Sequence, residues 1–259
     1  MTTGKSMKML HETRLMFVRS IQHTLRNPIW VVLSLVQPLL YLVLFMPLLK
    51  GLGGVPGLPQ GKTVQVFIPG LLVMLALFGS AFVGFGLVDE IRTGVIERFL
   101  VTPCNRLAIL SGRILKDVLV LLIQCVLITV CAIPFGLSIS IVGFLVSLLL
   151  YTLIAISMAS MSYALAITFR SEDTLASTLN TIALPVSLLS GIMLPLALAP
   201  LWLRDLAKAN PFSYAVNASR ALFSGDIFNA DVIKGFIIIA ILAVILFSWS
   251  VRALKRMIA

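Results

Sequence analysis

Long apolar runs recur along this chain, and several of them are long enough to cross a lipid bilayer. A transmembrane helix needs about 20 consecutive apolar residues, because the hydrocarbon core is about 30 Å thick and a helix rises about 1.5 Å per residue. Hydrophobic residues make up 59% of the sequence and charged residues only 12%, which excludes an ordinary soluble domain. The sequence therefore predicts an all-α polytopic membrane protein.

Six such runs are separated by polar or Gly- and Pro-rich segments. The predicted spans are residues 29–49, 66–88, 107–133, 141–168, 175–194 and 232–251. The segment 51–61 divides the first two, and Pro134-Phe-Gly136 divides the third from the fourth. Pro185 lies inside the fifth span, where it predicts a kink that a membrane helix tolerates. Gly79, Gly84 and Gly86 of the second span are interpreted as sites of close helix packing.

Residues 1–28 are interpreted as a cytoplasmic amphipathic helix lying in the membrane interface. Its apolar residues recur at helical intervals: Leu10, Phe17, Val18, Ile21 and Leu25. Asn27-Pro28 predicts its end. The segment lacks an uninterrupted apolar core, so we expect no cleaved signal peptide. A plain lipid anchor and a contact with a cytosolic partner both fit this pattern.

Basic residues fall mainly on one side of the six-span topology. They are Lys5, Lys8, Arg14, Arg19, Arg26, Arg92, Arg98, Arg106, Arg113, Lys116, Arg170, Arg252, Lys255 and Arg256. The positive-inside rule makes that side cytoplasmic, so both termini are expected in the cytoplasm of a cell (inner or plasma) membrane protein. The net charge of +10 then reflects topology and attraction to membrane lipid rather than nucleic-acid binding.

The loop 89–106, between the second and third spans, carries charges of both signs. At about 100° per residue, one side of this segment is apolar and the other polar. The apolar side has Val95, Ile96, Phe99 and Leu100, and the opposite side has Gly94, Glu97 and Arg98. We expect a helix of about two turns over 94–101, lying across the cytoplasmic end of the bundle and ended by Pro103. Asp89 and Glu90 could instead be helix-end residues paired with Arg92 or Arg113.

The segment 195–225 is amphipathic and interrupted at Asn210-Pro211. Trp202, Phe212 and Tyr214 suit the headgroup boundary, so a re-entrant or interfacial hairpin is expected on the outer side. A salt bridge between Arg220 and Asp226 within this loop is an alternative to a functional role for Arg220.

Two sets of motifs resemble those of ABC type-2 export permeases. The first is Glu90, Gly94, Glu97-Arg98 and Val101-Thr-Pro103, followed by Leu110-Ser-Gly-Arg113. The second is Ser190-Gly-Ile-Met-Leu-Pro195, Pro200-Leu-Trp202, Asn210-Pro211-Phe-Ser-Tyr214 and Arg220. The resemblance covers essentially the whole chain and is nearest to drug-resistance and nodulation-factor permeases, although polysaccharide and lipid-linked glycan exporters have a similar topology.

The resemblance implies that residues 29–259 form one transmembrane domain of a half-transporter. A second permease chain, expected to be identical, would complete the pathway, and a cytosolic ABC ATPase dimer would bind ATP and Mg. The chain itself has no Gly-x-x-x-x-Gly-Lys-Ser/Thr phosphate loop, so no catalytic role, cofactor or metal is expected in it. His11 and His23 are isolated and make a poor metal site.

The site residues implied by the resemblance fall into two groups. The ATPase-coupling group is Glu90, Arg92, Gly94, Glu97, Arg98, Phe99 and Pro103. The outer-gate group is Asn210, Pro211, Tyr214 and Arg220. Glu97 and Arg98 could alternatively form a salt bridge that only fixes the loop.

Three other function classes were weighed against export. An ion-coupled transporter would need acidic residues within its spans, whereas Asp117 lies near a span end and Asp173 precedes the fifth span. An intramembrane hydrolase would need a base beside Ser157, Ser162 or Ser190, and none is apparent. A non-transporting structural subunit remains open. Gln37, Gln124 and Asn180 are expected to face protein rather than lipid. An apolar pathway suits drugs, lipids and lipid-linked glycans equally.

Overall fold

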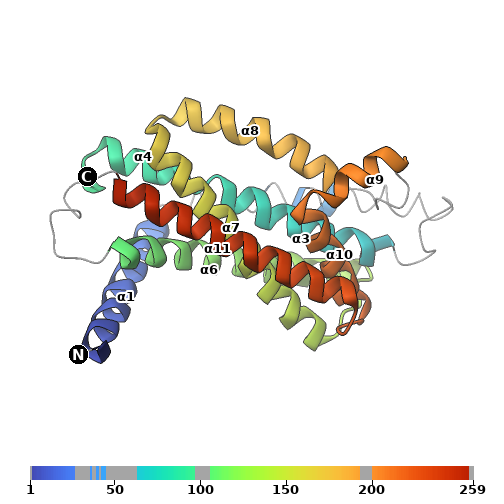
Figure 1. Ribbon diagram of the computed structural model, residues 1–259. Helices are drawn as coiled ribbons and strands as arrows, with labels where there is room; N and C mark the ends of the chain where they lie inside the picture. The colour runs from blue at the N-terminus through green and yellow to red at the C-terminus, as the bar shows by residue number, and fades with distance from the viewer. Residues whose placement is uncertain are drawn as a thin grey trace.

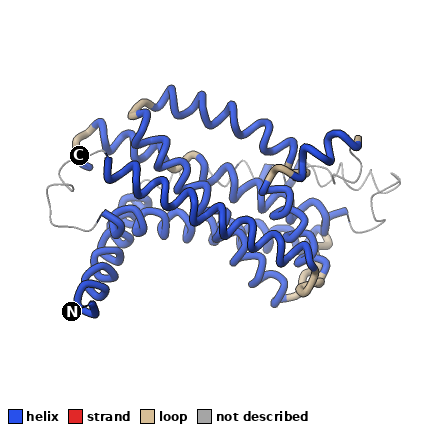
Figure 2. Tube along the Cα trace, in the orientation of Figure 1, coloured by secondary structure: helices blue, strands red, loops and turns tan. Residues whose placement is uncertain are grey.

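The computed structural model describes residues 2–26, 36, 39–40, 42–44, 63–96, 106–192 and 200–256. Figure 2 shows that these residues form helices joined by short loops, and the described part of the chain contains no strand. The helices are α1 (Thr2–Arg26), α3 (Thr63–Ala81), α4 (Gly84–Arg92), α6 (Arg106–Ala132), α7 (Ile141–Phe169), α8 (Glu172–Leu189), α9 (Leu201–Lys208), α10 (Pro211–Ser224) and α11 (Ala230–Arg256), with a 3-10 turn at Ile133–Phe135. The predicted all-α class is confirmed.

Four segments of the described chain are long and apolar enough to cross a membrane. They are Val64–Arg92, Leu107–Phe135, Ile141–Phe169 and Ala230–Arg256, at the places of the second, third, fourth and sixth predicted spans. Helix α8 covers most of the fifth, with Pro185 inside it, but it begins with Glu172 and Asp173 and is not among these four. The first predicted span, 29–49, lies almost wholly outside the described residues. The chain is therefore a multi-pass membrane protein, and the count of six stays a prediction.

Helix α7 is the centre of the bundle, contacting α3, α4, α6, α8, α10 and α11 (Figure 1). Its side chains Leu150, Tyr151 and Ile154 are fully buried. The long helices alternate in direction, which creates two different ends. We call one the charged end, where α4, α7 and α11 finish and α6 and α8 begin. The opposite, hairpin end holds α9 and α10.

The second predicted span is not one continuous helix. Helix α3 ends at Ala81 and α4 begins at Gly84. The hydroxyl of Ser162 on α7 fills the break, accepting a hydrogen bond from Gly84 N (2.9 Å) and donating one to Ala81 O. A side chain inserted between two helical turns is a known cause of such breaks, and it satisfies backbone groups that lipid could not. A Cβ at Gly84 would collide with Ser162, so close packing explains this glycine.

The predicted N-terminal helix is confirmed as α1, although it starts at Thr2. Figure 1 shows α1 diverging from the bundle at the charged end, and it packs against α6. The contact centres on Gly112, where an added Cβ would lie 2.7 Å from Met16 Cβ and 2.9 Å from Phe17 N. The opposite side of α1 is exposed and partly apolar, with Leu10, Leu15, Val18 and Leu25. Its placement in the membrane interface stays a prediction.

Candidate functional site

The charged stretch after the second span begins as helix rather than loop. Asp89 to Arg92 belong to α4, and the turn comes later, at Thr93 and Gly94. Thr93 N donates to Asp89 O (2.9 Å), and Gly94 N donates to Ile91 O (3.1 Å). Gly94 has a φ of +70°, a left-handed conformation that glycine adopts without a steric cost. The expected loop start at residue 89 is therefore wrong, because charges at a helix end do not stop the helix.

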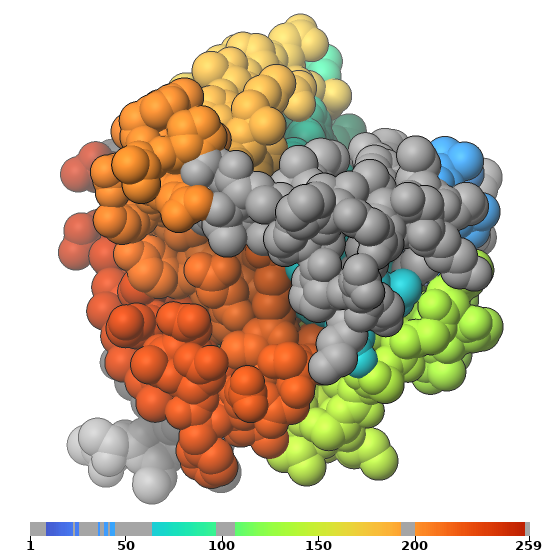
Figure 3. Space-filling view, turned by 90° about the vertical axis from the view of Figure 1, so that its right-hand side faces the viewer, coloured from blue at the N-terminus to red at the C-terminus, as the bar shows by residue number. Residues whose placement is uncertain are grey.

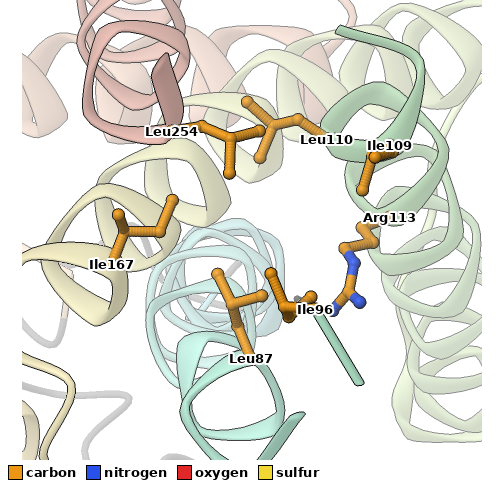
Figure 4. Close-up of a pocket in the computed structure, with 7 residues that line it drawn as sticks. All are labelled: Leu87, Ile96, Ile109, Leu110, Arg113, Ile167 and Leu254. Atoms are coloured by element: carbon orange, nitrogen blue, oxygen red, sulfur yellow. The ribbon is translucent and has the colours of Figure 1, made fainter. Parts of the chain in front are cut away.

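The backbone is helical again at Val95 and Ile96, so the predicted helix starts one residue after Gly94. Its remaining residues, including Glu97, Arg98, Phe99 and Pro103, lie outside the described part. Ile96 is 2% exposed and points into a small pocket (Figure 4). The pocket is lined by Leu87, Ile96, Ile109, Leu110, Arg113, Ile167 and Leu254. The first residues after the turn are thus held against α4, α6, α7 and α11.

A partly buried ion pair lies beside this pocket. Arg113 on α6 donates to the carboxylate of Glu90 on α4, with side-chain exposures of 11% and 22%. The interpretation of Glu90 as a helix-end residue paired with Arg113 is confirmed. Arg92 has a partner that the sequence did not suggest, Glu172 at the start of α8, with 3.4 Å between Nη1 and Oε1. This second pair is exposed, so it contributes little to stability.

Sequence reasoning missed a buried polar contact one helical turn further into the bundle. Asp117 on α6 accepts a hydrogen bond from the hydroxyl of Tyr163 on α7 and pairs with Lys116. Asp117 is 5% exposed and Tyr163 2%. Both residues lie 23 positions from Ser140, at the turn between two antiparallel helices, so register about that turn could have paired them. Among the described residues, these contacts join α4, α6 and α7 at the charged end.

The outer-gate candidates meet at the hairpin end. Asn210 precedes α10 and caps it, because its Oδ1 accepts from Phe212 N (3.1 Å). Pro211 is the first helical residue, the position that best tolerates proline. The hydroxyl of Tyr214 donates to Lys208 O (3.0 Å) and closes the turn from α9. The expected break at Asn210-Pro211 is confirmed, and the structure forms a helical hairpin there.

Arg220 contacts main-chain carbonyls rather than an acidic side chain. Its Nη2 lies 2.7 Å from Gly191 O and 3.4 Å from Ile192 O, and its Nε lies 3.3 Å from Val66 O. The alternative pairing with Asp226 is therefore wrong. Burial lowers the pKa of Arg220 to about 10, which keeps the guanidinium charged at neutral pH.

The remaining sequence candidates have structural partners. Ser157, Ser162 and Ser190 each donate to a main-chain carbonyl. Gln124 is buried as expected, whereas Asn180 is exposed on α8, contrary to expectation for a single chain; Gln37 lies outside the described residues. Within the described ranges, His, Cys, Asp and Glu side chains nowhere gather in a group of three that could hold a metal.

Fold and sites together define a class, a helical multi-pass membrane protein with an ion-paired end and a helical hairpin at the other end. The description "ABC-2 type transporter" matches residues 11–224, which is most of the chain. The chain belongs to the ABC-2 type transporter family. It is the transmembrane permease subunit of an ABC exporter.

Three similar proteins illustrate the range of the family. A putative transport permease ycf38 from Cyanophora paradoxa is 28% identical over 77% of this chain and 69% of its own length. The daunorubicin resistance ABC transporter permease protein DrrB1 from Streptomyces coeruleorubidus is 25% identical over 76% of this chain and 70% of its own. A probable doxorubicin resistance ABC transporter permease protein DrrC from Mycobacterium tuberculosis is 23% identical, covering 83% of this chain and 77% of the relative. The resemblance stated from the motifs is confirmed.

Proposed function

We propose that this permease works with a separate cytosolic ATPase dimer to export a hydrophobic or amphipathic compound. The names of two relatives, which refer to resistance to daunorubicin and doxorubicin, favour a planar, amphipathic drug over a glycan. ATP and Mg would be bound by the ATPase. The charged end would face the cytoplasm, because Arg92, Arg113, Arg170 and Arg252 all lie there, and the protein would reside in the cell (inner or plasma) membrane with both termini inside.

A second permease chain is part of this proposal. The exposed side of α8 carries Asn180 and Thr181 beside Leu184 and Leu188. Exposing an amide to lipid without a hydrogen-bond partner costs several kcal/mol. A second copy of the chain would cover this side, and a symmetric dimer is the common solution for identical subunits.

The turn at Gly94 is the observation that carries the coupling mechanism. It joins the end of α4 to the segment at 95–103, whose first apolar residue, Ile96, is buried against α6 and α11. Pressure from the ATPase on this segment, through Glu97, Arg98 and Phe99 before Pro103, would be passed to α4. The Glu90 pair with Arg113 would pass it on to α6, and the Arg92 pair with Glu172 to α8.

An ion-coupled transporter is the alternative function that one observation touches. Asp117 is a buried carboxylate within a membrane-spanning helix. Lys116 and Tyr163 already supply it with a cation and a hydroxyl donor, so a structural role accounts for it. Dependence of transport on a proton gradient, and loss of that dependence in Asp117→Asn, would favour the alternative.

The test of the proposed function compares three variants of the tagged full-length chain in its own membrane. Gly94→Pro requires a φ near −65° and is expected to abolish ATP-dependent uptake of fluorescent daunorubicin into inside-out vesicles. Gly94→Asn tolerates the left-handed conformation and is expected to retain most uptake. Glu97→Ala is expected to lower stimulation of ATP turnover without loss of the permease from the membrane. Reproducible absence of any co-purifying ATPase would overturn the proposal, as would equal uptake by Gly94→Pro and the unaltered chain.

A further inference from the structure

The carbonyl end of α8 is capped by side chains from a distant part of the chain. A helix leaves its last four carbonyl groups without a partner in the helix. In α8, Ser187 O accepts from Ser190 Oγ (2.7 Å), which is a local contact. Val186 O instead accepts from Asn210 Nδ2 (2.8 Å). Just beyond the helix, Gly191 has a φ of +68°, and its carbonyl oxygen accepts from Arg220.

Each of these two donors also holds a second element. Asn210 caps α10 through its Oδ1, and Arg220 reaches Val66 O on α3 through its Nε. Helix α3 approaches the same place closely, because an added Cβ at Gly70 would collide with the carbonyl oxygen of Ile192. The two side chains therefore join the ends of α8, α10 and α3, and a cation at a helix C-terminus is electrostatically favourable. We call this pair of contacts the carbonyl clamp.

Little else fixes α8 at this end. Its fully buried residues are Leu175 and Leu179, both in the half nearer the charged end. In the other half, Leu184 is 63% and Leu188 66% exposed. Figure 3 looks onto the hairpin end, where α9 lies beside α8, and the two helices are in contact. The position of α8 at the hairpin end thus depends on polar contacts with the hairpin rather than on apolar burial.

We propose that Asn210 and Arg220 are positioning residues for transport: the carbonyl clamp makes the C-terminal end of α8 move together with the α9–α10 hairpin and α3. The proposal rests on the proposed function in placing the hairpin at the outer end of the pathway. It adds the element that the hairpin controls, which is α8, and the two side chains that transmit the motion. Opening of the outer end would then displace α8 and the hairpin as one body.

The clamp is tested by measuring a distance between two spin labels in the full-length permease. Cys104, Cys125 and Cys131 are replaced by alanine, and the labels are placed at Leu188→Cys and Trp202→Cys, two exposed positions on α8 and α9. The unaltered clamp is expected to give one narrow distance distribution that is the same with and without ATP.

Graded variants separate the two contacts. Asn210→Asp keeps the acceptor for Phe212 N but cannot donate to Val186 O, and Arg220→Met removes every donor. Both are expected to broaden the distribution and to lower daunorubicin uptake about tenfold with ATPase binding retained. Arg220→Lys has one donor nitrogen in place of a fork, so it should keep the contact with Gly191, lose the one with Val66 and fall between. Lys208→Met is the matched control, since Lys208 lies in the same hairpin but pairs only with Asp205 at the surface.

Unchanged distributions in both Asn210→Asp and Arg220→Lys would overturn the proposal, even if these variants were less stable. Should Arg220→Met fail to accumulate, these two variants still decide. Distances measured without nucleotide test the clamp alone, whereas recovery of an ATPase with the tagged permease tests the proposed function, so the two can fail separately.

Discussion

The two ends of the helix bundle are held by different kinds of contact. At the charged end, side chain meets side chain: Glu90 with Arg113, and Asp117 with Lys116 and Tyr163. At the hairpin end, side chains meet the main chain, as Asn210 and Arg220 do. A pair of side chains can be exchanged without moving the backbone, whereas a contact with a carbonyl group requires a particular helix end in a particular place. The charged end can therefore be rewired by mutation, and the hairpin end cannot.

The largest expected effect tests this difference directly. Arg113→Met leaves the Glu90 carboxylate partly buried without its cation, which should lower the free energy of unfolding by about 3 kcal/mol. The exchanged pair Glu90→Arg with Arg113→Glu should recover part of the loss, measured by thermal unfolding in detergent. At the hairpin end no exchange partner exists for Arg220 among the described side chains. Failure of the exchanged pair to exceed Arg113→Met would contradict the comparison.

The next effect concerns the break between α3 and α4, midway between the ends. Ser162→Ala removes the hydroxyl that partners Gly84 N and Ala81 O, leaving both without that hydrogen bond. We expect a loss of about 2 kcal/mol in stability. Ser160→Ala is the control on the same helix, because the Ser160 hydroxyl is buried without a partner and should cost far less. Equal losses in the two variants would remove the role given to Ser162.

Two tyrosines of α7 provide a matched pair for the two kinds of partner. Tyr163→Phe deletes a hydrogen bond to the Asp117 carboxylate, and Tyr151→Phe deletes one to Ser219 (2.6 Å between oxygens). Both rings are buried, so their packing is retained. Hydrogen bonds to charged groups contribute about 2 kcal/mol and neutral ones about 1 kcal/mol, so Tyr163→Phe should lower the melting temperature more. The reverse order would show that Asp117 is protonated or otherwise satisfied.

The smallest effect is expected from the exposed pair at the charged end. Arg92→Gln removes the contact with Glu172, whose side chains are 66% and 44% exposed. We expect a change in stability below about 0.5 kcal/mol, because such pairs are screened by water and salt. A decrease in ATP-stimulated uptake without a change in melting temperature would assign the contact to coupling rather than to folding. A large drop in melting temperature would show that Arg92 carries more of the fold than its exposure suggests.

What could be predicted from the sequence was set by local patterns. Four spans were located because hydropathy depends only on neighbouring residues, and the break at Asn210-Pro211 because proline and asparagine signal a helix start. The break after Ala81 was missed, since the residue that occupies it, Ser162, lies on another helix.

Contacts between distant segments were the main failure. Arg220 was matched with Asp226 because the two are near in sequence, but its long side chain reaches carbonyls on α3 and beyond α8. The end of α4 was placed too early because Asp89 to Arg92 are charged, although only the backbone of Gly94 ends the helix. Local charge and proximity thus predicted the kind of residue at each site, and the fold decided its partner.

The crossing of α1 over α6 at Gly112 also has a consequence for biosynthesis. The ribosome makes α1 first, yet the groove it occupies, with no room for even a methyl group at Gly112, exists only after α3, α4 and α6 have been made. Until then, the exposed and partly apolar α1 has no protein partner on α6 and must wait at a lipid surface or on a chaperone. Docking of α1 therefore marks the moment at which the N-terminal part of the chain has been assembled correctly.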